Sequence, residues 1–278
     1  MENKLPRVTL FTSNQRRHVS LATELAQVCS EVFVIQESAT LFPGKKAGVV
    51  YDRTETMEAY FSHVNAAERK YFGDPTFLPE NVKSLSMAIG DLSHISKEIL
   101  DPALHSDYYI VFGASFIKGW LIDFLVSKKC INLHLGISPY MRGASCNFWA
   151  LYSGNYHLVG GTAHLITRGL DSGPMLWHAK PAADADFNSG FEFTMMAVVA
   201  MHRSLILHIK NGTLDKVLLS AALVQDKSKE VRYSRRSEFN DEVAQDFLSK
   251  ATNVEDIRKG LRNQDKSLFL NLFELGNK

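Results

Sequence analysis

Three polar side chains of the kinds that acyl-transfer chemistry uses occur in the middle of the chain. Residues 130–135 alternate apolar and polar side chains as a strand does, and this alternation places Asn132 and His134 on the same face. A second strand pattern, residues 161–166, leads into a turn that begins with Asp171. An amide, an imidazole and a carboxylate at strand ends and in a loop can meet at one point. The sequence therefore predicts a site for acyl chemistry there.

The patterns around these residues predict a parallel sheet that would position them. Residues 7–12 and 31–35 are short apolar runs, and the amphipathic segment 19–28 lies between them. A strand, a helix and a strand within such a short span form the βαβ unit of a parallel sheet. Residues 107–135 repeat this order, so the expected Asn132 strand is the second strand of such a unit.

The remaining patterns are less regular. Beyond residue 211 the chain changes character, and residues 242–275 predict one or two short helices. His202 and His208 lie in an expected helix without a metal-like set of partners, and we interpret them as structural. The other expected elements are a turn at residues 43–46, a helix over residues 54–71, a helix within residues 81–99, a strand at residues 175–179 and a long helix from about residue 184 to residue 209.

Length, charge and cysteine content limit the function classes. The chain has 278 residues, enough for one large domain with a small appendage, and its net charge of +1 gives no general attraction to nucleic acid or to an anionic membrane. Cys29, Cys130 and Cys146 are isolated, without metal-ligand spacing, so no metal is expected. The N-terminus lacks the long apolar segment of a signal peptide or membrane span. These observations together predict a cytoplasmic protein without a membrane partner.

The turn after the first expected strand, residues 13–18, lies where parallel sheets often hold an anion. It contains no glycine, which excludes a glycine-rich dinucleotide loop. Asn14, Arg16 and Arg17 are therefore candidates for binding a phosphate or another anion of a substrate. Solvated charges in the first turn of a helix are an equally good interpretation of the same residues.

The central motifs together resemble the signature of a known family, the 10-formyltetrahydrofolate-dependent formyltransferases. Members of that family read roughly Asn-x-His-x-x-x-x-Pro, then Arg-Gly, then Gly-x-Thr-x-His, then Leu-Asp-x-Gly. One such motif alone would be weak, but here all occur in order and at similar spacing, most securely within residues 108–177. In this chain the motifs are Asn132-Leu133-His134, Ser138-Pro139, Arg142-Gly143, Gly161-Thr162-Ala163-His164 and Leu170-Asp171-Ser172-Gly173.

The resemblance implies an α/β fold, a Rossmann-like and mostly parallel sheet with helices on both faces, as in the formyltransferase fold. It implies a catalytic domain at residues 1–210 and a small C-terminal extension at residues 211–278, whose fold the sequence does not define. The implied formyl donor is 10-formyltetrahydrofolate. The loop after the expected strand 107–113 would border its pterin ring. The matching positions are Phe112, Gly113, Ala114 and Ser115.

The resemblance also implies roles for the central residues. Asn132 would donate a hydrogen bond to the oxyanion of a tetrahedral intermediate, and charged His134 would be a second donor that could protonate the departing folate nitrogen. Asp171 would stabilise that imidazolium and accept the proton of the attacking amine. Arg142 is a candidate for substrate contact. His164 lies on the neighbouring strand, where a hydrogen bond within the core is an alternative role.

The acceptor is chosen by elimination among the family's substrates. The short tail and the net charge of +1 argue against methionyl-tRNA, and the turn at residues 13–18 departs from the glycine-rich loop of glycinamide-ribonucleotide enzymes. Formyl-folate hydrolases usually carry an additional N-terminal domain. An amino sugar linked to a nucleotide therefore fits best as the amine acceptor, and a non-catalytic relative that binds folate or nucleotide is an alternative. The apolar tail side chains could form a homodimer contact or cover the core; they are Leu268, Phe269, Leu272 and Phe273.

Overall fold

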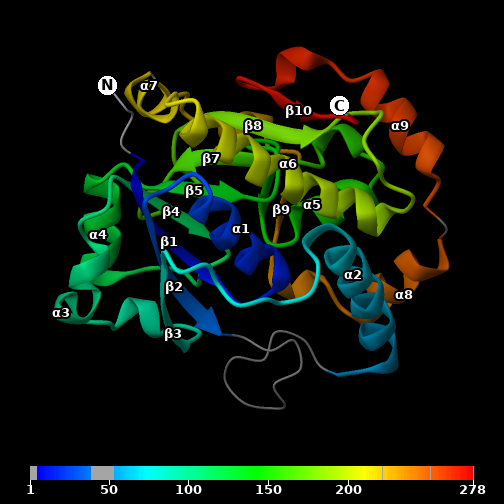
Figure 1. The fold of residues 1–278 in the computed structure, drawn as a ribbon. Coiled ribbons are helices and arrows are strands. Elements are labelled where there is room, and N and C mark those ends of the chain that lie inside the picture. The colour runs from blue at the N-terminus through cyan, green and yellow to red at the C-terminus, as the bar shows by residue number, and fades with distance from the viewer. Residues whose placement is uncertain (1–4, 39–52, 221, 251, 278) are drawn as a thin grey trace.

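The structure is a computed structural model that describes residues 5–38, 53–220, 222–250 and 252–277. Its centre is an 8-stranded sheet in the order β10-β8-β7-β5-β4-β1-β2-β3 (Figure 1). Within this sheet β7 is antiparallel to its neighbours β5 and β8, and the other adjacent strands are parallel. The strands of this sheet are β1 (Arg7–Ser13), β2 (Glu31–Ser38), β3 (Val82–Ala88), β4 (Tyr108–Phe112), β5 (Ile131–His134), β7 (Gly161–Leu165), β8 (Met175–Pro181) and β10 (Phe273–Leu275).

A second, 2-stranded sheet pairs β6 (Met141–Gly143) with β9 (Arg232–Ser234). The α-helices are α1 (Arg16–Ala26), α2 (Glu55–Phe72), α3 (Lys97–Leu100), α4 (Gly119–Ser127), α5 (Cys146–Tyr152), α6 (Gly190–Lys210), α7 (Leu214–Leu219), α8 (Asp241–Ser249) and α9 (Val254–Arg262). Short 3-10 turns join them at η1 (Asp91–Ser93), η2 (Asp101–Ala103), η3 (Tyr156–Leu158), η4 (Lys227–Lys229), η5 (Arg236–Glu238) and η6 (Lys266–Leu268).

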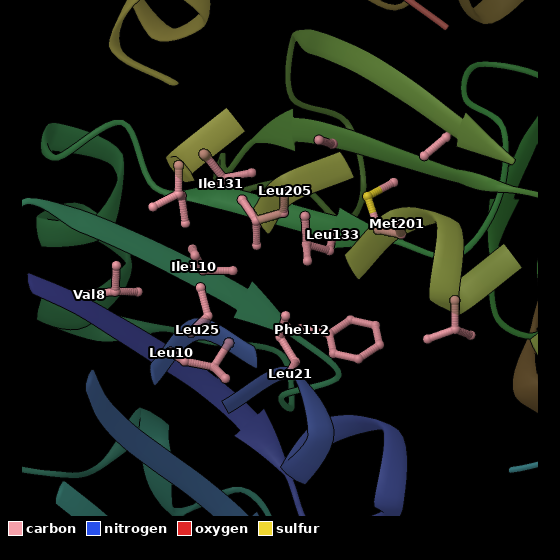
Figure 2. Close-up of a cluster of buried hydrophobic side chains, with 14 of the residues drawn as sticks. Val8, Leu10, Leu21, Leu25, Ile110, Phe112, Ile131, Leu133, Met201 and Leu205 are labelled. Atoms are coloured by element: carbon pink, nitrogen blue, oxygen red, sulfur yellow. The ribbon is translucent and has the colours of Figure 1, made fainter. Parts of the chain in front are cut away.

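Helices cover both faces of the main sheet because its central strands carry apolar side chains on both sides. On β4, Ile110 and Phe112 point into a core shared with α1 and α6, whereas Tyr109 and Val111 point into a core shared with α4. Figure 2 shows the first of these cores, where strand residues meet Leu21 of α1 and other helix side chains. The expected α/β class with a mostly parallel sheet is confirmed.

A third core, rich in aromatic rings, joins the C-terminal extension to the rest of the molecule. Tyr60 of α2, Phe148 of α5 and Phe239 of the extension have ring centroids 4.7 to 5.9 Å apart. Phe247 of α8 adds a ring 5.3 Å from Phe148. Aromatic pairs at these separations contribute about 0.5–1.5 kcal/mol each beyond the burial of their area. The extension is thus packed onto the molecule through its own buried side chains.

Helix α6 is long and apolar enough, by length and composition, to cross a membrane. The fold explains this apolar composition in another way, because 61% of the apolar 18-residue stretch of the helix is buried inside the structure. Phe193, Met201 and Leu205 of this helix are completely buried in the cores on which it packs. It begins at Gly190, where the side chain of Ser189 accepts a hydrogen bond from Glu192 N, rather than at residue 184 as predicted.

The other expected strands and helices among the described residues are confirmed, with one exception. The helix predicted within residues 81–99 is largely wrong, since residues 82–88 form strand β3 at the edge of the sheet and only the short α3 begins inside this range, at Lys97. No residue of this edge strand is fully buried, and only Val82, Leu85 and Met87 pack against the cores, so its apolar signal is short and weak. Strands β9 and β10 of the extension were not predicted. The turn expected at residues 43–46 lies outside the described residues.

The extension's apolar residues pack on the molecule itself. Phe269 lies against the aromatic core and Phe273 against the core under α6. Covering the core, one of the two alternatives raised above for these side chains, is therefore what the fold shows for these two residues.

Candidate active site

Asn132 and His134 project from the carboxyl end of β5, between β4 and β7. Strands β1, β4 and β5 are parallel, so their carboxyl ends share one edge of the sheet. In the sheet, β2 lies on one side of β1 and β4 lies on the other side, so the direction in which successive strands are added changes at β1. This edge is therefore the topological switch point at which open α/β sheets bind ligands.

Asp171 reaches the same point from the loop between β7 and β8. Its Oδ2 lies 3.5 Å from His134 Nδ1, and its Oδ1 lies 3.3 Å from Asn132 Nδ2. Both side chains are largely withdrawn from solvent, with 7% of the His134 side chain and 14% of the Asp171 side chain exposed. The structure thus brings together the three residues that the sequence singled out. The backbone of Asp171 has a positive φ of 43°, a conformation that non-glycine residues seldom adopt.

His164 holds Asn132 in place. Its Nδ1 is 2.9 Å from the carbonyl oxygen of Leu165, which can only accept a hydrogen bond, so Nδ1 carries the proton. The other ring nitrogen, Nε2, then accepts a hydrogen bond of 2.9 Å from the Asn132 amide. Both amide hydrogens of Asn132 are therefore engaged, one strongly with His164 and one weakly with Asp171. To donate to a reacting oxygen, the amide has to release the longer contact, with Asp171.

The charge state of the site follows from burial. Burial lowers the pKa of His134 below its usual 6.5, and the nearby Asp171 carboxylate only partly opposes this effect. The imidazole is therefore neutral at pH 7, not the imidazolium expected from the sequence. Burial tends to raise the pKa of Asp171, but His134, His164 and Arg142 outweigh it and bring that pKa to about 2. At neutral pH an ionised carboxylate thus faces a neutral imidazole.

Two cavities meet at this cluster, and Asn132 and Asp171 line both. The smaller has a volume of about 100 Å³ and the larger of about 530 Å³. The smaller cavity is lined by Val111, Ala114, Ser115, Phe116, Ile117, Ile122, Asn132, His164, Ile166, Thr167, Gly169, Leu170 and Asp171. The larger cavity is bordered by the carboxyl ends of β1, β4 and β5, by α2, α5 and α6, and by Arg236 and Phe239 of the extension.

The four expected pterin-binding residues divide between these cavities. Phe112 and Gly113 line the larger one, Ser115 the smaller, and Ala114 both. Ser115 is already bonded, because its backbone N–H and its hydroxyl both donate to the carboxylate of Glu37, at 2.6 and 2.8 Å.

Glu37 is a buried residue at the end of β2 that the sequence analysis did not identify. Besides Ser115 it accepts a hydrogen bond of 2.6 Å from Gly90 N, so three donors satisfy one buried carboxylate. It fixes the loop after β4 from a strand that lies two places away in the sheet. No local pattern marks such a residue, since its partner Ser115 lies 78 positions further along the chain.

Each of the three expected anion-binding residues already has a partner within the protein. Arg17 lines the larger cavity, but its guanidinium is paired with the buried Glu68 at 3.0 Å. Arg16 lies 3.5 Å from Asp74. Asn14 accepts a hydrogen bond of 3.3 Å from the hydroxyl of Ser13.

Arg142 is paired with Glu230 of the extension at 2.9 Å and donates to the carbonyl oxygen of Leu170 at 3.4 Å. It therefore supports the Asp171 turn and is not among the residues that line either cavity. Arg236, by contrast, is exposed at the larger cavity and makes no salt bridge among the described residues. It belongs to the basic run at residues 231–236 of the extension. Among the residues that the structure describes, no group of three His, Cys, Asp or Glu side chains is arranged to hold a metal ion.

Comparison with known proteins bears directly on this site. A family model described as formyl transferase matches residues 102–191, the segment that carries Asn132, His134 and Asp171. This central segment belongs to the formyl transferase family.

Individual relatives match parts of this chain. The chain is 30% identical to a methionyl-tRNA formyltransferase of Thermodesulfovibrio yellowstonii over 132 residues, which are 48% of this chain and 41% of that protein. It is 30% identical over 92 residues to formyltetrahydrofolate deformylase 2, mitochondrial, of Arabidopsis thaliana, covering 31% of this chain and 26% of that protein. The matched part is thus less than half the length of each relative. A 4-N formyltransferase structure from Francisella tularensis aligns over 99% of this chain and 100% of that one, with 13% identity and a TM-score of 0.48.

Proposed function

We propose that this protein transfers a formyl group from 10-formyltetrahydrofolate to the primary amine of a small acceptor. One observation carries the proposal: Asn132, His134 and Asp171 converge where two cavities meet, within the segment that belongs to the formyl transferase family. Two cavities that share one polar cluster suit a reaction with two substrates.

The charge states of His134 and Asp171 determine their roles in the reaction. The attacking amine must lose a proton, and neutral His134 beside ionised Asp171 is the pair that can accept it. Once His134 is protonated, Asp171 stabilises the imidazolium, and the ring can return the proton to the folate nitrogen that departs. Asn132 donates to the oxyanion formed when the amine adds to the formyl carbon. Losing one such donor costs about 3 kcal/mol of transition-state stabilisation, a factor of roughly a hundred in rate.

Direct transfer is better supported than a covalent intermediate on a cysteine. Cys146 lines the larger cavity, but burial raises the pKa of its thiol, so this group is protonated at neutral pH and is a poor nucleophile.

We place the folate ring in the smaller cavity and the acceptor in the larger one. The smaller cavity has apolar walls, such as Ile117 and Ile122, beside the polar rim formed by Ser115, Thr167 and Asp171. Such a slot suits a flat heterocycle with polar edges. Its small volume is consistent with a ring held between the loop after β4 and the loop before Asp171.

An amino sugar linked to a nucleotide is the acceptor that we favour. The larger cavity has about 530 Å³ and carries the exposed Arg236 at its rim, which suits a sugar with a nearby anionic group. The net charge of +1 offers little to a long nucleic acid. We also propose a cytoplasmic setting, which the free thiols of Cys29, Cys130 and Cys146 support.

The test is a kinetic assay with 10-formyltetrahydrofolate and a panel of amines: amino-sugar nucleotides, glycinamide ribonucleotide and methionyl-tRNA. Tetrahydrofolate release and formylated product are measured together. We expect both to depend on an amino-sugar nucleotide and to be lost in His134→Ala. His105→Ala is the matched control, because His105 is exposed, pairs with Asp101 and lines neither cavity. Formylation of methionyl-tRNA or glycinamide ribonucleotide would keep the reaction but replace the acceptor.

Hydrolysis of the formyl donor is the second candidate function. The relative from Arabidopsis thaliana is named as a formyltetrahydrofolate deformylase, and its match covers 92 residues, 31% of this chain. In the same assay a hydrolase would release tetrahydrofolate and formate without any amine. Folate binding without turnover for any acceptor would contradict both proposals and favour a non-catalytic relative.

A further inference from the structure

The turn that carries Asp171 is held by a residue of the C-terminal extension. The amide nitrogen of Gln225 donates to the carbonyl oxygen of Asp171 at 2.9 Å and to that of Gly173 at 2.8 Å. A side-chain amide has two N–H donors, and here each meets one carbonyl of the same turn. Gln225 lies 54 and 52 positions from these two partners in the sequence.

Gln225 is itself fixed. Its side chain is buried, with 8% exposed, and its Oε1 is a buried oxygen without a hydrogen-bond partner among the described residues. Two positions earlier, Leu223 forms an antiparallel bridge with Met175 through hydrogen bonds of 2.8 and 3.0 Å. The start of β8 and the extension are therefore joined directly behind the turn. A buried amide placed in this way retains little freedom of its own.

The conformation of Asp171 needs such support. A non-glycine residue with a φ of 43° is strained relative to the ordinary regions, so an unrestrained chain would leave this conformation. The carbonyl oxygen that Gln225 binds belongs to Asp171 itself, so its hydrogen bond acts on the strained peptide unit. In this conformation the carboxylate reaches both Asn132 and His134.

We infer that Gln225 is a positioning residue, which holds the carboxylate of Asp171 toward His134 and Asn132 for the reaction. This inference rests on the proposed formyl transfer for its kinetic consequence. Gln225 touches neither cavity, so it acts only through Asp171. A carboxylate that drifts by about 1 Å loses its proton-transfer geometry, and such misplacement reduces rates by up to roughly a hundredfold.

Other contacts keep the turn in place when Gln225 is changed. Gly173 packs so closely that a Cβ there would lie 1.7 Å from the carbonyl oxygen of Leu165, which ties the turn to β7. Arg142 binds the carbonyl oxygen of Leu170 at the other end. Loss of Gln225 should therefore release Asp171 without unfolding the loop.

The charge state of His134 reports the position of Asp171. The titratable or charged groups around this imidazole are Asp171, His164, Arg142 and Cys146. Of these, Asp171 raises the pKa of His134, whereas His164 and Arg142 lower it. If Asp171 moves away, the pKa of His134 must fall further below 6.5.

The experiment compares Gln225→Met with wild type in the full chain. Methionine has a similar length but cannot donate a hydrogen bond. We expect kcat to fall roughly tenfold to a hundredfold, with KM for the folate changed by less than about threefold. Titration of the histidine ring signals by NMR, with His134 assigned from His134→Gln, should show a lowered pKa for His134. Gln225→Leu is the second variant if the first does not fold.

Gln264→Met is the matched control. Gln264 also belongs to the extension, where it accepts a hydrogen bond from Lys180 and donates one of 2.8 Å to Glu274, far along the chain from the Asp171 turn. A merely structural role for Gln225 would give both variants the same loss of stability and leave kcat and the His134 titration unchanged in each, and this result would overturn the inference. The titration needs no turnover, so it decides the point even if wild type transfers no formyl group. In that case formyl transfer fails while the positioning role is still tested.

Discussion

His134 Nδ1 lies 3.5 Å from Asp171 Oδ2, and burial rather than this carboxylate determines the sign of the pKa shift of the imidazole. The pair therefore rests as neutral base and ionised acid at neutral pH. This arrangement accepts a proton readily, and the paired charges form only after the proton has arrived. Its behaviour under mutation and pH change follows directly.

Asp171→Asn should reduce kcat roughly a hundredfold or more, because the amide cannot stabilise the imidazolium. The rising limb of kcat/KM against pH should have an apparent pKa below 6.5 in wild type, since the neutral imidazole is the active form. It should move lower still in Asp171→Asn, which lacks the charge that raises the pKa of His134. The measurement is a pH–rate profile of both proteins. Asp123→Asn, an exposed residue paired with Arg168, is the control, and an unshifted limb in Asp171→Asn would contradict the coupling.

Glu37→Gln should weaken binding of the folate while leaving the chemical step nearly intact. The carboxylate accepts hydrogen bonds from Gly90 N and from both donors of Ser115, and glutamine retains only one acceptor oxygen. Hydrogen bonds to a charged group contribute about 1.5–3 kcal/mol, so we expect KM for the folate to rise by roughly tenfold or more. Steady-state kinetics with varied folate measure this change.

The control for that prediction is Glu31→Gln at the other end of the same strand, where Glu31 pairs with Arg7 and Lys83. Equal KM values for the folate in the two variants would show that the loop after β4 does not depend on Glu37.

Arg236→Ala should raise KM for an anionic acceptor, because its guanidinium lies at the rim of the larger cavity. An exposed charge-assisted contact of this kind supports an increase of roughly threefold to tenfold, smaller at high salt. Arg235→Ala is the matched control, since that neighbouring arginine does not line the cavity. If both variants bind the acceptor alike at low salt, Arg236 has no specific role.

Acidification should destabilise the fold through His178. Burial lowers the pKa of this histidine from 6.5 to about 4, and its Nδ1 accepts a hydrogen bond of 2.9 Å from Leu270 N, which only the unprotonated nitrogen can do. The unfolded chain therefore binds more protons once the pH falls below 6.5, and the stability that exists above this pH is lost progressively down to about pH 4. Between pH 7 and pH 5 the loss from this residue is about 2 kcal/mol.

Denaturant unfolding at the two pH values measures this effect. His178→Gln retains an acceptor for Leu270 N but does not titrate, so its free energy of unfolding should fall by about 2 kcal/mol less over the same range. Buried His18 and His134 and half-buried His157 and His208 also have lowered pKa values and contribute to the slope in both proteins. Identical slopes in wild type and His178→Gln would refute the assignment to His178.

What the sequence predicts well is local. The alternation around Asn132 and His134 predicted a strand and a shared face, and the turn residues after residue 170 predicted the loop that carries Asp171. Contacts between distant segments leave no such pattern. Glu37 and Gln225 are ordinary polar residues in their own surroundings, and only the fold shows that one orders the loop after β4 and the other the Asp171 turn. Strand β3 was missed for a related reason, because an edge strand buries too few side chains to give a clear period.

The charge state of His134 was also beyond the sequence. The expected imidazolium followed from pairing with Asp171, but a pKa depends on how much water is excluded, and that depends on the packing of β6 and α5 around the ring. Residue types can suggest which groups lie close together. They do not show how far water is excluded from the site they form.

Strand β10 has a consequence for self-association. It pairs with β8 through Phe273, Glu274 and Leu275, and it covers an edge of the main sheet that would otherwise be open. Every residue of β8 is buried, and β10 pairs with its last three residues, so without β10 the backbone groups of this part of the edge would be unpaired. A chain shortened to residues 1–210 would expose this edge to the same edge of another copy. We therefore expect the three-residue strand to protect the molecule from aggregation.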